Sequence, residues 1–321
     1  MKILVTGANG FVGSHVVARL QEMGHEALGI VRPSAAFVAR IPGVEYAVLQ
    51  DPYAPEEWGS FVRNRDAVIH LIARTHHLNE KNEGEQALFE KYMRVNLGVT
   101  KALVEGMKNE KIKRFLYVSS IKAVGEGSSV PYTEETPCAP QDFYGRSKRE
   151  TEVFLCGCDF LDVTILRPPL VYGEGVKGNF CELLRAIARQ RPLPLGCLSE
   201  NARSVIYVKN LVDALLLCLQ REESKGQIFH VSDQETPSTK DLVTVMGEVL
   251  GISPRLVPVP QSVLLFVGAV FGKKDKILKL TGSNTLSWEK ISHMLGWKPR
   301  FSLKQGLQET VQKFKERGLS S

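Results

Sequence analysis

The first residues place a short apolar run directly before three evenly spaced glycines, and this junction restricts the possible folds more than any other part of the chain. Residues 2–6, KILVT, are mostly aliphatic, which favours a buried strand. Gly7, Gly10 and Gly13 follow, and residues 11–23 have apolar positions at helical spacing. Such a strand–turn–helix unit holds a pyrophosphate at the helix N-terminus, where N–H groups and a partial positive charge face the anion.

Each glycine has its own role in this prediction. Gly7 permits the tight turn, Gly10 lets a pyrophosphate approach the backbone, and Gly13 lets the helix pack closely against its strand. The alternative is a glycine-rich turn that binds nothing, because three glycines at this spacing are a weak signal by themselves. The strand before them and the amphipathic helix after them favour the phosphate-binding interpretation.

Strand and helix signals continue to alternate through the first half of the chain. Helices are predicted notably at 85–109 and 142–157, and buried strands at 26–32, 44–50, 67–73, 114–118 and 162–167. This alternation predicts an α/β fold, a doubly wound parallel (Rossmann) sheet of about seven strands with helices on both faces. Ligands of such sheets bind at the carboxyl ends of the strands.

The pattern changes after residue 167, which indicates a second unit. Sequence rich in proline and glycine follows, and strand and helix signals return only at 204–208, 210–220 and 226–232. The rest of the chain is rich in predicted helix. We therefore predict an NAD(P)-binding Rossmann domain of residues 1–168, completed by about 204–235, and a smaller C-terminal α/β substrate-binding cap of residues 169–203 and 236–321.

Charge and cysteine content limit the classes of partner. The net charge is +6, but the basic residues are scattered and no aromatic RNA-binding motif accompanies them. We therefore expect an anionic small substrate and no nucleic acid. The six cysteines include no CxxC pair, and Cys156 and Cys158 are the only close pair. Reduced structural thiols and no metal site are the expectation.

The N-terminus and the most apolar segment of the chain bear on where in the cell the protein is found. The N-terminus, MKILVTGANG, lacks the apolar region and cleavage site of a signal peptide, so we expect a cytoplasmic protein. Residues 262–272 are strongly apolar but too short to span a bilayer, which argues against stable membrane insertion. We interpret them as a core helix or the wall of a substrate pocket, with loose membrane contact as the alternative.

Two adjacent hydroxyls follow one of the predicted strands, and a YxxxK pattern follows them. Tyr144 and Lys148 lie four residues apart in a helix predicted to begin near Asp142, so their side chains share one helix face. An ammonium beside a phenol favours the phenolate and lowers the tyrosine pKa from about 10 towards the range of a general acid–base. Ser119 and Ser120 are the paired hydroxyls, and a helix cap or a turn pair is one explanation of them.

The end of the second strand bears on the choice of cofactor. An acidic residue at this point binds the two ribose hydroxyls of NAD, but here the strand ends in Val31-Arg32-Pro33-Ser34. An arginine with a nearby serine suits a 2′-phosphate. We therefore expect NADP(H) in preference to NAD, with a solvated strand-end charge as the other explanation of Arg32.

These motifs together resemble the extended branch of the short-chain dehydrogenase/reductase superfamily, the NAD-dependent epimerase/dehydratase family. The motifs are TGxxGxxG near the N-terminus, the paired serines and YxxxK. The segments RPPLVYGEGVKGNF (167–180) and SWEKISHMLGWKPRFSLKQGLQET (287–310) extend the resemblance over nearly the whole chain. It is strongest to UDP-glucose (UDP-N-acetylhexosamine) 4-epimerases and UDP-4-keto-6-deoxy-hexosamine 4-reductases.

The resemblance implies roles for individual residues. Tyr144 is the proton donor or acceptor, Lys148 holds the nicotinamide ribose, and Ser120 polarises the substrate oxygen, with Ser119 as the alternative. Asp51 corresponds to an acidic position at the adenine edge, and Pro168 to a proline near the nicotinamide. The implied cofactor contacts are Gly7, Asn9, Gly10, Phe11, Val12, Gly13, Arg32, Asp51, Pro52, Leu71, Ile72, Ala73, Asn96, Ser119, Tyr144, Lys148 and Pro168.

The implied substrate contacts lie partly in the cap. They are Ser120, Tyr144, Asn179, Leu195 and Arg203, with Leu195 in the strip PLPLG that corresponds to the wall of a nucleobase pocket. Asn179 and Arg203 would contact the diphosphate, a role that suits a guanidinium through bidentate hydrogen bonds. The alternatives are that Asn179 caps a helix and that Arg203 holds a loop. His76, His77 and Asn96 fall in the right region for side roles, but an exposed loop explains the histidines better, and helix packing is the alternative for Asn96.

The two residues after the serine pair bear on which reaction the protein catalyses. In the sugar-nucleotide 4,6-dehydratases of this superfamily an Asp-Glu pair follows the hydroxyl residue, whereas this chain has Ile121 and Lys122. Without that carboxylate pair we expect hydride transfer at C4 of a UDP-hexose or UDP-N-acetylhexosamine and no loss of water. A 4-epimerase keeps NAD bound, and a 4-ketoreductase consumes NADPH; both stay open.

Two other functions are alternatives. One is an NADPH-dependent ketone reductase on a non-sugar substrate of the dihydroflavonol or 3β-hydroxysteroid kind. The other is a non-catalytic NADP-binding sensor, although such proteins usually lose the tyrosine or lysine of YxxxK. Family members often form homodimers through a four-helix bundle that includes the YxxxK helix, and we expect the same here.

Overall fold

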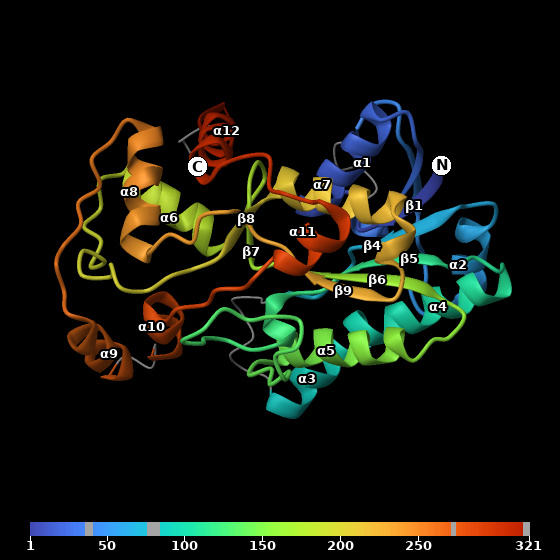
Figure 1. Ribbon diagram of the computed structural model, residues 1–321, viewed down its shortest axis with the longest axis horizontal. Coiled ribbons are helices and arrows are strands. Elements are labelled where there is room, and N and C mark those ends of the chain that lie inside the picture. The colour runs from blue at the N-terminus through green and yellow to red at the C-terminus, as the bar shows by residue number, and fades with distance from the viewer. Residues whose placement is uncertain (36–40, 76–83, 271–273, 317–321) are drawn as a thin grey trace.

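Seven parallel strands form the central sheet of the part of the chain that the structure describes. This computed structural model describes residues 1–35, 41–75, 84–270 and 274–316. The strand order is β3-β2-β1-β4-β5-β6-β9 (Figure 1). Their bounds are β1 (Lys2–Thr6), β2 (Glu26–Val31), β3 (Glu45–Val48), β4 (Ala67–His70), β5 (Arg114–Val118), β6 (Asp162–Arg167) and β9 (Gln227–His230). The strand order reverses between β1 and β4, and ligands bind at the carboxyl ends of the strands at such a switch point.

Helices cover both faces of this sheet because alternate strand residues point to opposite sides. Ile3 and Val5 of β1 pack with α1 (Phe11–Glu22), α7 (Val208–Gln220) and α11 (Glu289–Leu295). Leu4 packs on the other side, in a cluster with α2 (Pro55–Val62), α4 (Val99–Asn109) and α5 (Phe143–Cys156). The two helical layers are visible above and below the sheet in Figure 1. The predicted doubly wound α/β fold is confirmed.

The single helix predicted for 85–109 is wrong in one respect. The segment consists of α3 (Glu85–Met93), a π-helical turn (Arg94–Gly98) and α4. The turn carries Asn96, whose amide accepts from the backbone N–H of Arg74 at 2.7 Å and donates to Ser147 Oγ at 2.7 Å. A wider turn at this point accommodates a buried polar side chain, and periodicity in the sequence does not reveal it.

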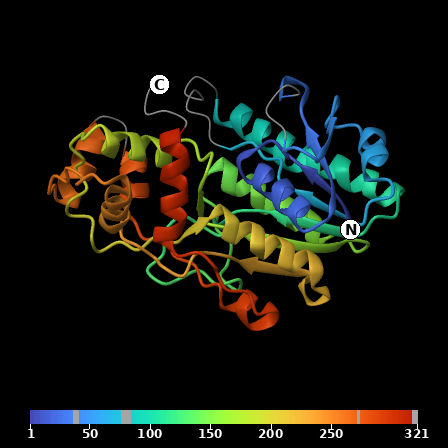
Figure 2. The same ribbon diagram turned by 90° about the horizontal axis from the view of Figure 1, so that it is seen from above.

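The second group of elements packs around a core of its own. β7 (Leu170–Tyr172) and β8 (Val205–Tyr207) form a separate two-stranded sheet, so the strand predicted at 204–208 does not join the central sheet. The helices on this side are α6 (Asn179–Ala188), α8 (Thr239–Leu250), α9 (Gln261–Val270), α10 (Lys274–Thr281) and α12 (Leu303–Glu316). Their shared core includes Tyr172, Phe180 and Tyr207. Figures 1 and 2 show this smaller unit beside the sheet, as predicted; the residue limits of the two domains stay a prediction.

The interpretation of 262–272 as a core helix is wrong for its described part, and the alternative of a pocket wall stays a prediction. α9 buries Gly268 and leaves most of its large apolar side chains exposed. No helix in the described ranges is both long and apolar enough to cross a membrane.

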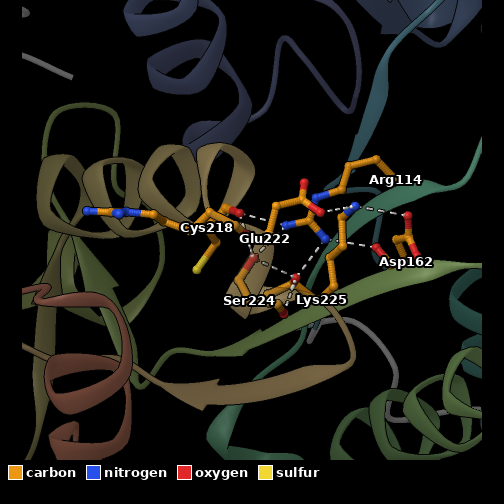
Figure 3. Close-up of polar contacts among 8 residues, drawn as sticks. Arg114, Asp162, Cys218, Glu222, Ser224 and Lys225 are labelled. Atoms are coloured by element: carbon orange, nitrogen blue, oxygen red, sulfur yellow. Dashed lines mark hydrogen bonds and ion pairs between the residues drawn. The ribbon is translucent and has the colours of Figure 1, made fainter.

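A buried arginine fastens the edge of the sheet opposite the carboxyl ends of its strands. Arg114, the first residue of β5, donates to the carbonyl oxygens of Asp162 at 2.8 Å and Cys218 at 2.6 Å. It also donates to Ser224 Oγ at 2.7 Å (Figure 3). The Cys218 carbonyl lies in the last turn of α7, where a cation is favoured by the helix dipole. This contact ties β5, β6 and α7 together.

Candidate active site

The glycine loop closes so tightly that two of its positions exclude a side chain. Gly7 has φ +64°, in the left-handed region, and its carbonyl accepts from the Gly10 N–H at 2.9 Å. A Cβ on Gly13 would lie 2.1 Å from that carbonyl oxygen. Gly10 is the N-cap of α1 and supplies no side-chain cap, and the first turn of α1 contains no acidic residue. The loop therefore presents an open helix N-terminus that fits the pyrophosphate of a dinucleotide.

We expect Gly13→Ala to weaken dinucleotide binding at least about tenfold, because the added methyl displaces the Gly7 carbonyl and with it the loop. Isothermal titration with NAD and NADPH measures the change. Gly84→Ala is the matched control, since a Cβ there meets no atom within 4 Å and the residue has φ −62°. Equal affinities of the Gly13→Ala variant and the unchanged protein would contradict the assignment of the loop.

The segment after β4 lies against this loop. Thr6 Oγ1 accepts from the backbone N–H groups of Leu71 at 3.0 Å and Ile72 at 3.3 Å. The Ile72 nitrogen lies 3.4 Å from where a Cβ on Gly7 would be. The structure therefore brings the predicted contacts at Leu71 and Ile72 together with Gly7, and Ala73 directly follows them in the chain. Asn9, Phe11 and Val12 are half-buried at the start of α1.

The residues predicted at the adenosine end lie on the neighbouring strand ends. Arg32 is exposed directly after β2, and Asp51 is exposed after β3, which pairs with β2. Asp51 Oδ1 accepts from the Tyr53 N–H at 2.8 Å, which shapes the turn. The Pro52 carbonyl accepts from Trp58 Nε1 at 3.0 Å. Arg32 and Asp51 are thus placed at the same edge of the sheet as the glycine loop.

Ser120, Tyr144 and Lys148 meet where β5 ends. Asp142 caps α5 by accepting from the Gly145 N–H at 2.7 Å, and this fixes Tyr144 in the first turn of the helix. The hydroxyls of Tyr144 and Ser120 are hydrogen-bonded. Lys148 lies one turn further along α5, with Nζ 6.0 Å from the centre of the Tyr144 ring. The contact predicted from the YxxxK spacing is present.

Lys148 is buried and contacts β5 from below the tyrosine. Its Nζ donates to the Val118 carbonyl at 2.7 Å and to Tyr117 Oη at 3.1 Å. Tyr117 stacks in turn on the buried His70 at 5.9 Å. Burial lowers the pKa of Lys148 to about 7, although Glu152 opposes the shift.

The pKa of Tyr144 is not lowered as the YxxxK pattern predicts. Burial and the Asp142 carboxylate raise the pKa of Tyr144 above its usual value, and the hydrogen bond to Ser120 opposes them only in part. Spacing places the lysine on the right face, but it does not show that the phenol is buried and that a carboxylate lies beside it.

The lowered pKa of Lys148 predicts a pH dependence of stability. Between pH 7 and about 10.5 the unfolded chain binds more protons at this residue than the folded chain, so the free energy of unfolding rises with pH. From pH 7 to pH 9 this contribution is about 2 kcal/mol. Urea unfolding of the unliganded protein at both pH values measures it, and Lys148→Met should remove the difference. An equal pH dependence in that variant would contradict the lowered pKa.

Ser119 points away from Tyr144. Its hydroxyl donates to Glu152 Oε1 at 2.5 Å, and Glu152 also pairs with the buried Arg167 at 2.6 Å. The serine that contacts the tyrosine is therefore Ser120. Pro168 is buried next to it, and its carbonyl accepts from the Ile121 N–H at 2.9 Å.

Lys122 has contacts that the sequence did not reveal. Its Nζ lies 2.6 Å from Asp142 Oδ2 and 3.3 Å from Glu126 Oε1. Lys122 thus pairs with the carboxylate that caps α5 beside Tyr144. The sequence alone shows only that a cation replaces the glutamate of the dehydratases.

The structure brings only some of the predicted substrate residues to the edge of the sheet where Tyr144 lies. Asn179 is exposed at the start of α6, and Leu195 is buried in the core shared with α8 and α12, so its side chain does not form an open pocket wall. Arg203 is half-buried and donates to the Gly282 carbonyl at 3.4 Å. Burial lowers the pKa of Arg203, and the negative charge of Glu126 opposes this shift. His76 and His77 lie outside the described residues. No cluster of metal ligands occurs among the described residues.

Comparison with known proteins agrees with this geometry. A family model described as the NAD dependent epimerase/dehydratase family matches residues 3–232. The chain belongs to this family. A UDP-glucose 4-epimerase from Vibrio cholerae is 35% identical over an alignment of 318 residues, and the match covers 97% of this chain and 95% of that protein. The predicted membership of the epimerase/dehydratase family is confirmed, and with it the expectation of a nicotinamide cofactor.

Solved structures of epimerases share the fold. The UDP-glucose 4-epimerase of Thermotoga maritima, solved with UDP-glucose, has a TM-score of 0.80 at 24% identity and covers 99% of both chains. The UDP-glucuronic acid 4-epimerase of Bacillus cereus, solved with NAD, has a TM-score of 0.78 at 21% identity, again over 99% of both chains. The sheet with its smaller second unit is therefore the architecture of these epimerases.

Proposed function

We propose that the protein is an NAD(P)-dependent nucleotide-sugar 4-epimerase acting at C4 of a UDP-hexose or UDP-N-acetylhexosamine. The observation that carries the proposal is the group of Ser120, Tyr144 and Lys148 at the same sheet edge as the open N-terminus of α1. The Vibrio cholerae relative, named a UDP-glucose 4-epimerase, supports the reaction and the substrate class.

The residues present account for the proton side of such a reaction. A bound nicotinamide cofactor would supply the acceptor and donor of the C4 hydride, and the positive charge of its oxidised ring would favour the phenolate form of Tyr144. Tyr144 accepts the proton of the C4 hydroxyl as a phenolate and returns it as a phenol. Ser120, already hydrogen-bonded to that phenol, orients the same oxygen. Lys148, anchored on Val118, would hold the nicotinamide ribose.

A 4-ketoreductase that uses NADPH is the second candidate, and Arg32 favours it. The arginine is exposed at the end of β2, where an acidic residue would otherwise bind the ribose of NAD. The raised pKa of Tyr144 also suits this reaction, because a protonated phenol is ready to donate to a carbonyl oxygen.

A 4,6-dehydratase is disfavoured by the residues next to Ser120. Ile121 is buried, and Lys122 lies between the carboxylates of Asp142 and Glu126. An ammonium held by two carboxylates is a poor base for removing a C5 proton. We therefore propose that the reaction stops at hydride transfer.

The identity of the bound cofactor and the fate of the sugar together test the proposal. The protein is purified without added cofactor, the released nucleotide is identified by mass spectrometry, and UDP-glucose and UDP-N-acetylglucosamine are then incubated with it. Retained NAD and appearance of the C4 epimer support the epimerase. An empty site with NADPH consumption on a 4-keto sugar nucleotide establishes the reductase, and turnover of neither overturns both.

Arg203 gives a separate test of the substrate class. If it contacts the diphosphate, Arg203→Ala raises the KM for a UDP-sugar by about tenfold and leaves kcat nearly unchanged. Arg191→Ala, an exposed arginine of the same unit, is the control. An unchanged KM would instead favour a ketone reductase on a non-sugar substrate.

We also propose a homodimer formed through α4 and α5. Val153 of α5 is 50% exposed, and a surface cavity of about 850 Å³ lies beside it, lined among others by Lys101, Glu105 and Phe154. These features match the surface that a four-helix bundle would cover. The cytoplasmic location stays a prediction.

A further inference from the structure

The backbone of Lys122 joins the turn that carries Ser120 to the helix that carries Tyr144. Its N–H donates to Ser120 Oγ at 3.3 Å, and the 3₁₀ turn Ile121–Ala123 packs against α5. Its carbonyl oxygen lies against Gly145, where a Cβ would come within 2.3 Å of that oxygen. The position of Lys122 therefore sets the spacing between the serine turn and the first turn of α5.

The side chain of Lys122 adds ion pairs to this backbone contact. Its Nζ lies 2.6 Å from Asp142 Oδ2 and 3.3 Å from Glu126 Oε1. The other oxygen of Asp142, Oδ1, accepts from the Gly145 N–H at 2.7 Å, so one carboxylate both caps α5 and binds Lys122. The side chain of Lys122 is 25% exposed and those of the two acids are less exposed still, so water and salt screen these charges less than they would at the open surface.

The negative charge of Asp142 opposes the proton transfer at Tyr144. In both candidate reactions the phenol passes through a phenolate, either before it accepts the proton of a C4 hydroxyl or after it donates one to a C4 carbonyl. A carboxylate nearby disfavours that anion: burial and, after it, Asp142 raise the pKa of Tyr144. An ammonium 2.6 Å from the same carboxylate reduces its effect on the phenol.

We propose that Lys122 is a positioning residue of the candidate active site, which holds the Asp142 cap against the Ser120 turn and offsets the negative charge that this cap places beside Tyr144. The start of α5 needs the acceptor oxygen of Asp142 but not its charge, because asparagine caps helices about as well as aspartate. Lys122 compensates the charge that the helix does not require. The inference rests on the proposed function, since it takes Tyr144 to be the residue that moves the proton.

The test is the turnover, by variants of the full-length protein, of the UDP-sugar or 4-keto sugar nucleotide that the unchanged protein converts. Lys122→Met should lower kcat by about tenfold, because a bare carboxylate beside the phenol disfavours the phenolate, and it should leave the cofactor affinity nearly unchanged. Lys122→Arg should restore most of the lost kcat, since it keeps the positive charge. The double variant Lys122→Met/Asp142→Asn should return to within about threefold of the unchanged protein, because asparagine still caps α5 and adds no charge.

Lys225→Met is the matched control. Lys225 is also held by two carboxylates, with Nζ 3.3 Å from Asp162 Oδ2 and 2.6 Å from Glu222 Oε2, but it lies at the opposite edge of the sheet (Figure 3). Its side chain is 32% exposed, which is similar to that of Lys122. Lys225→Met should therefore leave kcat unchanged, and thermal unfolding of every variant confirms that it folds.

The outcomes separate this inference from the proposed function. Full kcat in Lys122→Met, an equal loss in Lys225→Met, or a double variant no better than Lys122→Met overturns the role of Lys122 and leaves the proposed function standing. Turnover of neither substrate class by the unchanged protein overturns both. If Lys122→Met does not fold, the double variant decides: a kcat more than about tenfold below that of the unchanged protein overturns the role.

Discussion

Tyr144→Phe lowers kcat by about 10²–10⁴-fold, because the variant keeps the ring but loses the only proton that the phenol moves. The hydroxyl that is removed is hydrogen-bonded to Ser120. Lys148 keeps its contacts with Val118 and Tyr117, so the cofactor affinity should change little. The measurement is turnover of the UDP-sugar, or of the 4-keto substrate, together with titration of the cofactor.

Two comparisons make this result specific. Ser119→Ala serves as the control for the loss of a hydroxyl at the same turn, because its hydroxyl points to Glu152 and should affect stability more than kcat. Ser120→Ala should lower kcat by less than Tyr144→Phe, since a neighbouring hydroxyl orients the oxygen but does not carry the proton. Full turnover by Tyr144→Phe would exclude an enzyme of this mechanism and return the non-catalytic sensor to consideration.

Glu152→Ala lowers the free energy of unfolding by about 3–5 kcal/mol, because it leaves the guanidinium of Arg167 buried without its carboxylate. Both side chains are almost fully buried, and Arg167 donates to Glu152 at 2.9 Å from Nε and 2.6 Å from Nη2. Ser119 loses its acceptor as well, at 2.5 Å. Urea unfolding of the unliganded protein measures the loss.

Arg149 provides the matched control. It pairs with the same Glu152 at 3.3 Å, but its side chain is 35% exposed, so Arg149→Ala should cost no more than about 1 kcal/mol. The double variant Glu152→Leu/Arg167→Met should be less destabilised than Glu152→Ala, since it removes both buried charges. A loss below 1 kcal/mol in Glu152→Ala would show that the buried pair does not hold the Ser119 turn.

Much of the fold could be predicted because it depends on local patterns. The run KILVT and the glycines after it define β1, the loop and α1, since only glycine fits where a Cβ would lie 2.1 Å from a carbonyl oxygen. Alternating apolar runs define the central sheet. The π-helical turn at Asn96 was missed, because it depends on a buried partner, Ser147, fifty-one positions away.

In the candidate site, too, some features could be predicted from the sequence and others could not. The YxxxK spacing was sufficient to put Tyr144 and Lys148 on one helix face, one turn apart. The choice between Ser119 and Ser120 depends on which way each hydroxyl points, and their adjacency in sequence carries no such information. Likewise, the ion pairs of Lys122 with Asp142 and Glu126 join residues from separate segments.

The sequence by itself determined the phosphate loop, the doubly wound sheet, the tyrosine–lysine pair and the family, because each depends on residues close together in the chain. Only the tertiary structure decided the electrostatics and the surface. Burial and Asp142 raise the pKa of Tyr144, and α9, expected as a core helix or a pocket wall, leaves most of its large apolar side chains exposed. Both depend on which distant groups a side chain meets after folding, and that is set by packing and not by local spacing.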